Sequence, residues 1–577
     1  MKLYLVRKNL KYYATTLIVT LVLIFSNRAM AQGEQFLIDY DINYKIGENG
    51  VTSITHQAII TNLQNDVIPT VYTFAAKQIK IYEVTSTTND KKVEAKIEQK
   101  EDENLVSVTL ENYAIGEGRQ NTISLNYKTD DIASRSGKIW NIYIPKIEIP
   151  ETTTLYNVRL SIPKSFGRKI YLSPTPVIEK DEGDNKIYYF TKETFKSTGI
   201  IAAFGDYQPF NFKLKYQIKN NSILPSIKEV AFPPDVKEYQ NVSFKEITPS
   251  PYKIKLDGDG NTIATYILGP LKEMEIELKG TARLYGKQIN PDFGRGLSGI
   301  PEDLIKKYTK EQTYWEVNSP AIKEVSKELK DETLNVTKNA QKIYNFINNN
   351  ISYDFDAVEK GLTERKGAEA AITKEGKWTC MEYSDLFITL TRSMGIPSRE
   401  INGYAFTFDD SNNPISINLE GGDFLHSWAE FYDPFYGWIQ VDPTWGTTSG
   451  IDYFTKLDTN HFAFVIKGLN SEQPYPAGTY RFSEKEKLID VALSQSTQEE
   501  DFAPRMKFQK IFNFNPIEII KGNIKVKAQN IGDVSAYNVG GATLPPKGIQ
   551  NLFVNKENKE INFEDMNGNK YSKIIER

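Results

Sequence analysis

The chain has 577 residues, of which 40% are hydrophobic and 25% are charged, so it is long enough for several globular domains rather than one. Its formal net charge is −4 and its basic residues form no block, which argues against nucleic acid as a partner. A single cysteine excludes any intramolecular disulfide.

Residues 1–31 have the pattern of a signal peptide. Basic residues up to Lys11 precede an apolar run from Ala14 to Phe25, and Ala29-Met30-Ala31 is a small-x-small cleavage signal. The apolar run has about a dozen residues, fewer than the roughly 20 that span a bilayer. We therefore expect an exported protein (secreted, periplasmic or on the cell surface) that begins near Gln32; an uncleaved N-terminal anchor is the alternative. No later segment is apolar enough to cross a membrane.

The region from 32 to 288 is predicted to be β-rich. Segments such as Phe36–Tyr44 and Val106–Leu110 alternate apolar and polar residues, and glycine-containing turns separate them. Many short strands at regular spacing are typical of β-sandwiches. We expect one or two sandwich modules in 32–208 and a second sandwich-like module in 209–288.

Helical patterns appear after residue 289. Residues 335–349 carry apolar side chains at helical spacing, and strand-like segments follow the later helices. We predict an α+β domain over 289–470. Strand patterns return after residue 471, so we expect a C-terminal extension with a small β domain over 471–577.

Cys380, the only cysteine, is predicted to lie in the first turn of a helix that ends at Gly395. The unpaired N–H groups of a helix start and the helix dipole favour a thiolate, and these N–H groups can also stabilise an oxyanion. Two simpler roles are a buried apolar cysteine and an intermolecular disulfide. The apolar residues that form one face of this helix are Tyr383, Leu386, Phe387, Leu390 and Met394.

A predicted hairpin brings an aspartate to a histidine. His426 lies in the strand 424–432, Asp433 to Gly437 form a turn, and the returning strand ends at Asp442. If the turn is centred near residues 434–435, His426 faces a position within about two residues of Asp442. The carboxylate of Asp442 can then reach the imidazole of His426. Cysteine, histidine and aspartate are the parts of a nucleophilic triad.

The same residues resemble the transglutaminase-like superfamily over about residues 335–465. The resemblance rests on three elements in order: Trp378-Thr-Cys-Met-Glu-Tyr-Ser with Gly395-Ile-Pro, then His426-x-Trp-x-Glu, then Trp438-x-x-x-Asp-Pro-Thr. It implies a papain-like α+β fold in which Cys380 is the nucleophile, His426 is its base and Asp442 orients the histidine.

Neighbouring residues have alternative roles. Trp378 and Trp428 are candidates for the oxyanion site or the acyl channel, and core packing is the alternative for both. We expect Glu430 to be a solvated strand residue, and the alternative is that it orients a partner. We expect His461 to be structural, and the alternative is that it contacts the site. Residues 409–413 form an acidic loop that we expect to be solvated rather than calcium-binding. No pattern typical of a metal site occurs, so we expect no metal and no cofactor.

Three functions are consistent with the sequence. The first is an exported cysteine acyltransferase that forms a thioester at Cys380 from a protein amide and transfers the acyl group to an amine or to water. The second is a cysteine peptidase that uses the same triad. The third is a surface binding or scaffold protein whose transglutaminase-like domain is not catalytic. In each case the partners are proteins or peptides at the cell envelope or outside the cell.

Overall fold

The computed structural model describes residues 35–576, except residues 78, 100–102, 137, 146–152, 196–198, 361–363, 408–413, 416, 420–421, 483–484 and 495–500. The predicted signal peptide therefore lies outside the described residues. The chain divides into two compact units. The first comprises residues up to 133, 144–165 and 175–199, and the second comprises 134–143, 166–174 and 200–577. No helix in the described part of the chain is long and apolar enough to cross a membrane.

The first unit contains a mixed eight-stranded sheet in the order β13-β14-β11-β1-β2-β8-β4-β5 and a three-stranded sheet in the order β3-β7-β6. Residues of β2 alternate between buried and more exposed positions, as the sequence pattern predicts. The elements are β1 (Phe36–Ile46), β2 (Thr52–Asn62), β3 (Val71–Lys77), β4 (Tyr82–Thr88), β5 (Lys91–Val93), β6 (Ala95–Gln99), β7 (Glu103–Thr109), β8 (Gln120–Thr129), β11 (Tyr156–Pro163), β13 (Ile178–Glu182), β14 (Asn185–Phe190) and the short helix α2 (Lys192–Phe195).

The second unit begins with three sheets. One has the order β12-β15-β10-β9, the next β18-β21-β16-β29, and the third β17-β20-β19. The last two sheets share one hydrophobic core. The division of this region into sandwich modules, with the boundaries given above, stays a prediction. The strands are β9 (Ala133–Ser136), β10 (Ile139–Ile144), β12 (Lys169–Ser173), β15 (Ile200–Phe204), β16 (Gln208–Lys219), β17 (Ser226–Phe232), β18 (Gln240–Thr248), β19 (Lys253–Leu256), β20 (Thr262–Leu268), β21 (Glu273–Leu284) and β29 (Ile489–Leu493).

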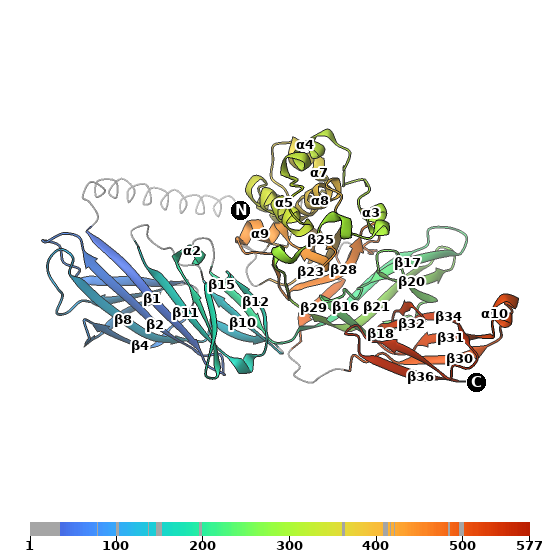
Figure 1. Cartoon of the computed structure of the whole chain (residues 1–577), viewed down its shortest axis with the longest axis horizontal. Helices are drawn as coiled ribbons and strands as arrows, with labels where there is room; N and C mark the ends of the chain where they lie inside the picture. Colours follow the sequence, from blue (N-terminus) through green and yellow to red (C-terminus); the bar gives the residue numbers. More distant parts are fainter. Residues whose placement is uncertain are drawn as a thin grey trace, which may run out of the picture. The chain divides into compact units, whose positions relative to one another are not determined.

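An α+β domain follows, in which helices cover an antiparallel sheet of order β24-β25-β23-β28, with β26 paired to β25 (Figure 1). Helix α8 packs directly on β25 and β23. The helices are α3 (Glu302–Tyr308), α4 (Pro320–Leu329), α5 (Val336–Asn350), α6 (Phe355–Glu359), α7 (Ala368–Thr373), α8 (Cys380–Ser393) and α9 (Pro443–Ser449). The strands are β22 (Lys287–Gln288), β23 (Ser398–Ala405), β24 (Ile417–Leu419), β25 (Asp423–Asp433), β26 (Gly437–Val441), β27 (Lys456–Leu457) and β28 (His461–Lys467).

Two of the predicted helices in this domain are confirmed. Helix α5 has apolar residues such as Ile343 and Ile347 buried in the main core cluster, and the side chain of Asn335 caps its first turn. Helix α8 starts at Cys380 and is followed by Gly395 with a φ of +86°, a left-handed conformation that glycine adopts without strain.

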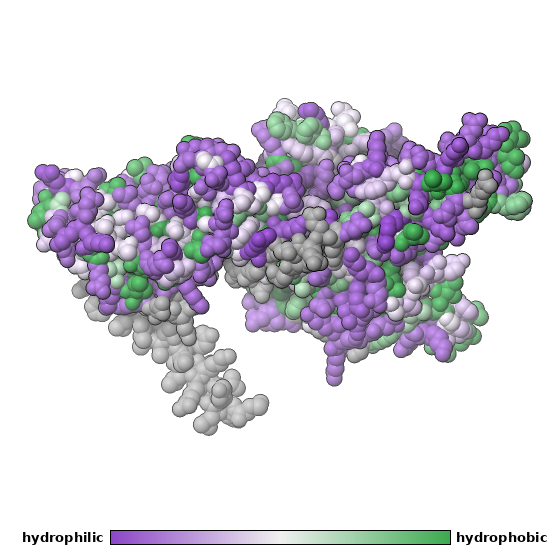
Figure 2. Space-filling view, turned by 90° about the horizontal axis from the view of Figure 1, so that it is seen from below, coloured by the Kyte–Doolittle hydropathy of each residue, from purple (hydrophilic) through white to green (hydrophobic). Residues whose placement is uncertain are grey.

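The C-terminal residues form a seven-stranded sheet of order β33-β32-β35-β36-β30-β31-β34. Its hydrophobic core includes Phe508, Val526 and Phe563. Hydrophobic residues on the face seen in Figure 2 gather in a few places among mainly hydrophilic ones. The elements are β30 (Met506–Ile511), α10 (Pro516–Ile520), β31 (Asn523–Asn530), β32 (Ala536–Val539), β33 (Ala542–Leu544), β34 (Ile549–Asn555), β35 (Glu560–Glu564) and β36 (Lys570–Glu576).

Candidate active site

Cys380 is the first residue of α8 and is fully buried. Its position is held by the preceding residue, since the hydroxyl of Thr379 donates to Oε2 of Glu382 at 2.9 Å and the backbone N–H of Thr379 donates to the same oxygen at 3.1 Å. Glu382 also accepts the N–H of Lys366 at 2.8 Å. The Thr-x-x-Glu spacing is the sequence signature of a capping box, and it specifies that the helix begins at the cysteine.

His426 and Asp442 meet as the hairpin predicts. Strands β25 and β26 pair as far as Ala429 opposite Val441, and Asp442 follows directly after the last paired residue of β26. Nε2 of His426 lies 2.9 Å from Oδ2 of Asp442, and both side chains are fully buried. Asp442 is also the N-cap of α9, where its Oδ1 accepts the N–H groups of Thr444 and Trp445 at 2.9 and 3.1 Å. The aspartate is therefore fixed from two sides.

The second ring nitrogen of His426 is the one available to Cys380. Nδ1 is buried and has no hydrogen-bond partner of good geometry among the described residues. Cys380 nevertheless lies close enough to stabilise the charged form of the ring. The structure thus brings His426 and Asp442 into contact and places Cys380 close enough to influence the charge of the ring.

The electrostatics favour a protonated His426. Burial lowers the pKa of His426, but the charge and hydrogen bond of Asp442, with a smaller contribution from Cys380, raise it to about 9. Burial also acts to raise the pKa of Asp442, and the neighbouring His426 and His461 outweigh it, so that this pKa lies below its usual range. Asp442 is therefore a carboxylate at neutral pH.

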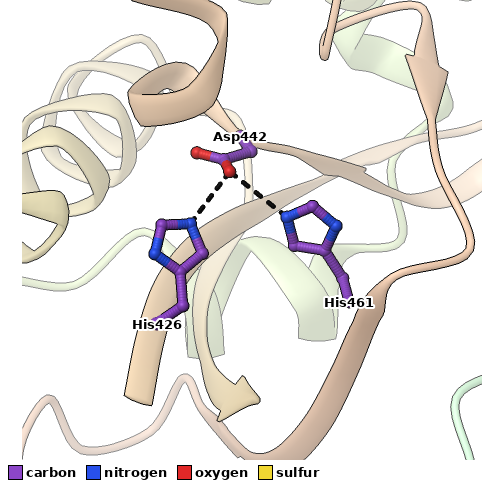
Figure 3. Close-up of side chains that lie close together, drawn as sticks. All are labelled: His426, Asp442 and His461. Carbon is purple, nitrogen blue, oxygen red and sulfur yellow. Dashed lines mark hydrogen bonds and ion pairs between the residues drawn. The ribbon is translucent and has the colours of Figure 1, made fainter. Parts of the chain in front are cut away.

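His461 is a further neighbour of the site, a position predicted only as the alternative to a structural role. From the start of β28, its Nε2 lies 3.2 Å from Oδ2 of Asp442 (Figure 3). Its Nδ1 lies 2.7 Å from Oδ1 of Asp458. Burial lowers the pKa of His461, and the two aspartates raise it to about 9. One carboxylate oxygen of Asp442 thus faces two imidazole rings.

Aromatic side chains enclose these polar groups. The ring of Trp428 is stacked 6.1 Å from that of His426, and its Nε1 donates to Oε1 of Gln440 at 3.0 Å. Trp445 is stacked 5.2 Å from His426 and lies 4.6 Å from His461. Burial among such rings strengthens the ion pairs within the site. Trp428 is both a wall of the site and part of the core cluster.

Trp378 lies beside the site in sequence but is packed in the core. It is 5% exposed and belongs to the main hydrophobic cluster. Its backbone N–H and carbonyl bond to Ser352 and Asp354 at 2.9 and 3.0 Å, which ties the segment before Cys380 to the end of α5. Its candidate role at the oxyanion or acyl channel stays a prediction.

The expectation for Glu430 is wrong. Glu430 is fully buried rather than solvated, and it accepts a hydrogen bond from Nε of Arg399 at 2.7 Å. The guanidinium of Arg399 also lies 3.8 Å from the ring centre of Trp438. Alternation along β25 places Glu430 on the face of His426, and Arg399 lies directly opposite Glu430 on the neighbouring strand β23. The predicted acidic loop at 409–413 lies outside the described residues.

The donor atoms at the site could also ligate a metal. Nε2 of His426, Nε2 of His461 and one oxygen of Asp442 lie within 4.8 Å of one another. Two imidazoles and a carboxylate are ligands that Zn²⁺ accepts. In this arrangement the carboxylate already bonds to both rings, so these contacts account for the cluster without an ion.

Comparisons with known proteins identify relatives of uncharacterized function. The chain is 21% identical over 315 residues to the uncharacterized protein YebA of Bacillus subtilis, which covers 51% of this chain and 42% of YebA. It is 27% identical over 133 residues to an uncharacterized protein of Haemophilus influenzae, which covers 21% of this chain and 35% of that protein. The chain therefore spans less than half of the length of either relative.

A solved structure from Cytophaga hutchinsonii, provisionally named a cysteine protease, aligns with this chain at 18% identity and a TM-score of 0.32. The alignment covers 50% of this chain and 99% of the solved chain. Residues 323–443, which include Cys380, His426 and Asp442, match the transglutaminase-like superfamily. The chain thus carries a transglutaminase-like domain in this stretch.

Proposed function

We propose that the protein is an exported cysteine acyltransferase of the transglutaminase-like type. In this proposal Cys380 is the nucleophile, His426 transfers protons and Asp442 orients the imidazole. The acyl donor is the amide of a protein or peptide at the cell envelope or outside the cell, and the acceptor is an amine or water.

The reaction has two stages. The Cys380 thiolate attacks the amide carbonyl, and backbone N–H groups at the start of α8 stabilise the oxyanion. The C–N bond then breaks, and His426 gives its proton to the leaving nitrogen. In the second stage an amine or water attacks the thioester and gives a proton to His426, while the C–S bond breaks and restores the thiolate.

The observation that carries the proposal is the placement of the His426 ring. Asp442 bonds to Nε2 of His426 at 2.9 Å. Nδ1 of the same ring has no hydrogen-bond partner of good geometry among the described residues, and Cys380 stabilises the charged form of this ring. A buried structural cysteine needs neither a helix start nor an imidazole oriented by a carboxylate. A pKa of about 9 for His426 supports an imidazolium at neutral pH, which can give its proton to the leaving nitrogen.

The acceptor decides between the transferase and a cysteine peptidase, because both use the same thioester. Cys380 and His426 are fully buried, so a substrate reaches the sulfur only after surrounding side chains move. This burial favours neither acceptor, and the assay below therefore measures both products.

The test is to incubate the chain from Gln32 onward with a glutamine-containing protein and a labelled primary amine. The Cys380→Ala variant is the matched comparison, and tryptophan fluorescence checks that it is folded. We expect labelling that disappears in the variant. Cleavage without labelling, again lost in the variant, would assign the peptidase instead. Equal labelling and cleavage by both proteins would contradict a catalytic Cys380 and leave the binding or scaffold function.

A further inference from the structure

The C-terminal domain carries an apolar tip on the connection between β30 and β31. This connection contains α10, which projects beyond the strands in Figure 1, and hydrophobic side chains gather at this end in Figure 2. We define the apolar tip by its five exposed side chains: Phe512 at 79%, Phe514 at 82%, Ile517 at 62%, Ile519 at 55% and Ile520 at 85% exposed. Apolar side chains gathered at this exposure are typical of an interaction surface.

Hydrogen bonds within the connection hold these apolar side chains outward. Oδ1 of Asn515 accepts the N–H of Ile517 at 3.1 Å and caps α10. Nδ2 of Asn513 donates to the carbonyl of Asn523 at 3.1 Å. The polar side chains of this loop therefore bond inward, and the apolar ones are left to face solvent.

The one acidic residue of the tip is paired within the connection. Glu518 accepts from Nδ2 of Asn523 at 2.6 Å and from Nζ of Lys521 at 3.0 Å, and its side chain is only 17% exposed. The carboxylate within the tip is therefore paired. Pairing a charge lowers the cost of moving the tip out of water, compared with leaving that charge without a partner.

Lysines lie around the base of the tip. Lys510 is the last residue but one of β30, just before the tip, and Lys525 pairs with Ile511 across the β30–β31 ladder. The N–H of Lys556 donates to the carbonyl of Gly522 at 3.0 Å, which places this lysine at the same end. Such a basic collar complements a negatively charged surface, and long lysine stems can extend toward headgroups while the tip lies deeper.

We propose that the apolar tip inserts into the interfacial region of an anionic lipid bilayer and anchors the C-terminal domain there. Phenylalanine and isoleucine carry no polar group that would need a partner in the acyl region, whereas protein hot spots favour tyrosine, tryptophan and arginine. A projecting loop with a basic collar matches the geometry of a bilayer surface, with apolar groups inside and cations at the headgroups. The proposal is independent of the function of Cys380.

Vesicle binding tests the proposal with the chain from Gln32 onward, which retains every described residue. Vesicles of phosphatidylcholine alone are compared with vesicles that also contain phosphatidylglycerol. The variant Phe512→Ser/Phe514→Ser/Ile520→Ser replaces the three most exposed of the five apolar side chains of the tip and changes no buried residue. The control Val177→Ser/Ile178→Ser changes two apolar residues that are 53% and 54% exposed, at the start of β13.

We expect binding to the anionic vesicles that falls by about tenfold or more in the tip variant and is unchanged in the control. Equal binding by the tip variant and the unmodified chain would overturn the proposal. A second result would also overturn the proposal: neither protein binds vesicles, and without lipid the unmodified chain self-associates while the tip variant does not. The apolar tip would then be a protein interface.

A site-specific probe shows where the tip lies. Because Cys380 is the only cysteine, a Cys380→Ala background allows Ile519→Cys to be labelled with nitrobenzoxadiazole. We expect its fluorescence to rise with anionic vesicles and to be quenched by lipids that carry a nitroxide on the acyl chain. An unchanged signal during vesicle binding would assign the attachment to another surface and would also overturn the proposal.

Discussion

Asp442 supports three structures at once, since it contacts two imidazole rings and caps helix α9. Asparagine has nearly the same shape and can still cap a helix, but it carries no charge. The Asp442→Asn variant therefore isolates the electrostatic role of the carboxylate from its structural role.

We predict that Asp442→Asn keeps the fold but lowers kcat/KM for amine incorporation by about 10³- to 10⁴-fold, because the imidazolium and its orientation lose their support. Measured initial rates with the labelled amine check this outcome. Tryptophan fluorescence serves as the control for folding. A loss of less than about tenfold would mean that Asp442 does not orient a catalytic His426.

The two histidines make the stability of this domain depend on pH. The pKa values of His426 and His461 are both raised from 6.5 to about 9 in the folded protein. A histidine whose pKa is higher in the folded state than in the unfolded state stabilises the folded protein. This stabilisation is complete at a pH below the pKa of the unfolded state, and it is lost as the pH rises through the pKa of the folded state. Each unit by which the pKa in the folded state exceeds that in the unfolded state corresponds to about 1.4 kcal/mol in the free energy of unfolding.

We therefore predict that the domain becomes less stable between about pH 6 and about pH 10, in the window that the two pKa values define. Five of the six tryptophans lie between residues 315 and 445, so fluorescence during urea unfolding reports on this domain. In Asp458→Asn, which removes a partner of His461, the loss over the same range should be smaller. An identical pH dependence in both proteins would contradict a charged His461.

At the scale of elements, Gly403 shows how closely β23 and β28 approach beside the site. Gly403 pairs with His426 on β25, and the register between β23 and β28 shifts at this residue. A Cβ atom at Gly403 would lie 2.1 Å from the carbonyl oxygen of Phe462 and 2.9 Å from Cα of Ala463. Both contacts are with backbone, so only a strand shift could relieve them.

We predict that Gly403→Ala destabilises the domain by about 1–3 kcal/mol or more, because β23 must move away from β28. The same movement should displace His426 and His461 and lower the rate of amine incorporation. Urea unfolding and the labelling assay measure the two effects. The control is Gly376→Ala, whose Cβ would make only ordinary contacts of 3.6 Å or more with Trp378. Equal stability of the two variants would show that the approach of the strands is not restrictive.

At the scale of the whole molecule, the preceding β strands complete the sheet of the α+β domain. Strand β28 is an edge strand, and edge strands leave backbone groups unpaired. The amide of Gln240 bonds to both backbone groups of Ala463, at 2.9 and 2.7 Å. The amide of Asn261 bonds in the same way to Ile466, at 2.7 Å for each contact. Two side chains thus take the place of a further strand.

We predict that Gln240→Ala and Asn261→Ala each destabilise the α+β domain by about 1–3 kcal/mol, since each leaves a buried N–H and C=O of β28 unpaired. The exposed Asn349→Ala, on α5, is the control and should change the stability little. Tryptophan-detected unfolding is the measurement. If both variants unfold like the control, the contacts with β28 do not stabilise it.

Local patterns predicted the parts of the site that depend on neighbouring residues. Apolar spacing and a glycine stop predicted helix α8 with Cys380 in its first turn, and the structure adds the capping box that begins the helix at Cys380. The hairpin of β25 and β26 follows from alternation and turn residues, and it brings Asp442 to His426. In such elements the partners are close in sequence, so their geometry is nearly determined by the chain itself.

Contacts between distant segments could not be predicted in this way. Nothing near Glu430 indicates that Arg399 will bury it, and nothing near His461 indicates that it will face Asp442. Strand β29 returns after the α+β domain and pairs with β16, more than 270 residues earlier along the chain. These pairings depend on how whole sheets pack, and a hydrophobic pattern shows that a strand is buried but not which neighbour buries it.

The sequence by itself determined that Cys380 begins a helix and that His426 and Asp442 share a hairpin, because helix capping and turn geometry act over a few residues. Only the tertiary structure decided that the helix packs on this hairpin, that His461 joins the carboxylate and that side chains of an earlier sheet pair with β28. These outcomes depend on close packing between elements far apart in the chain.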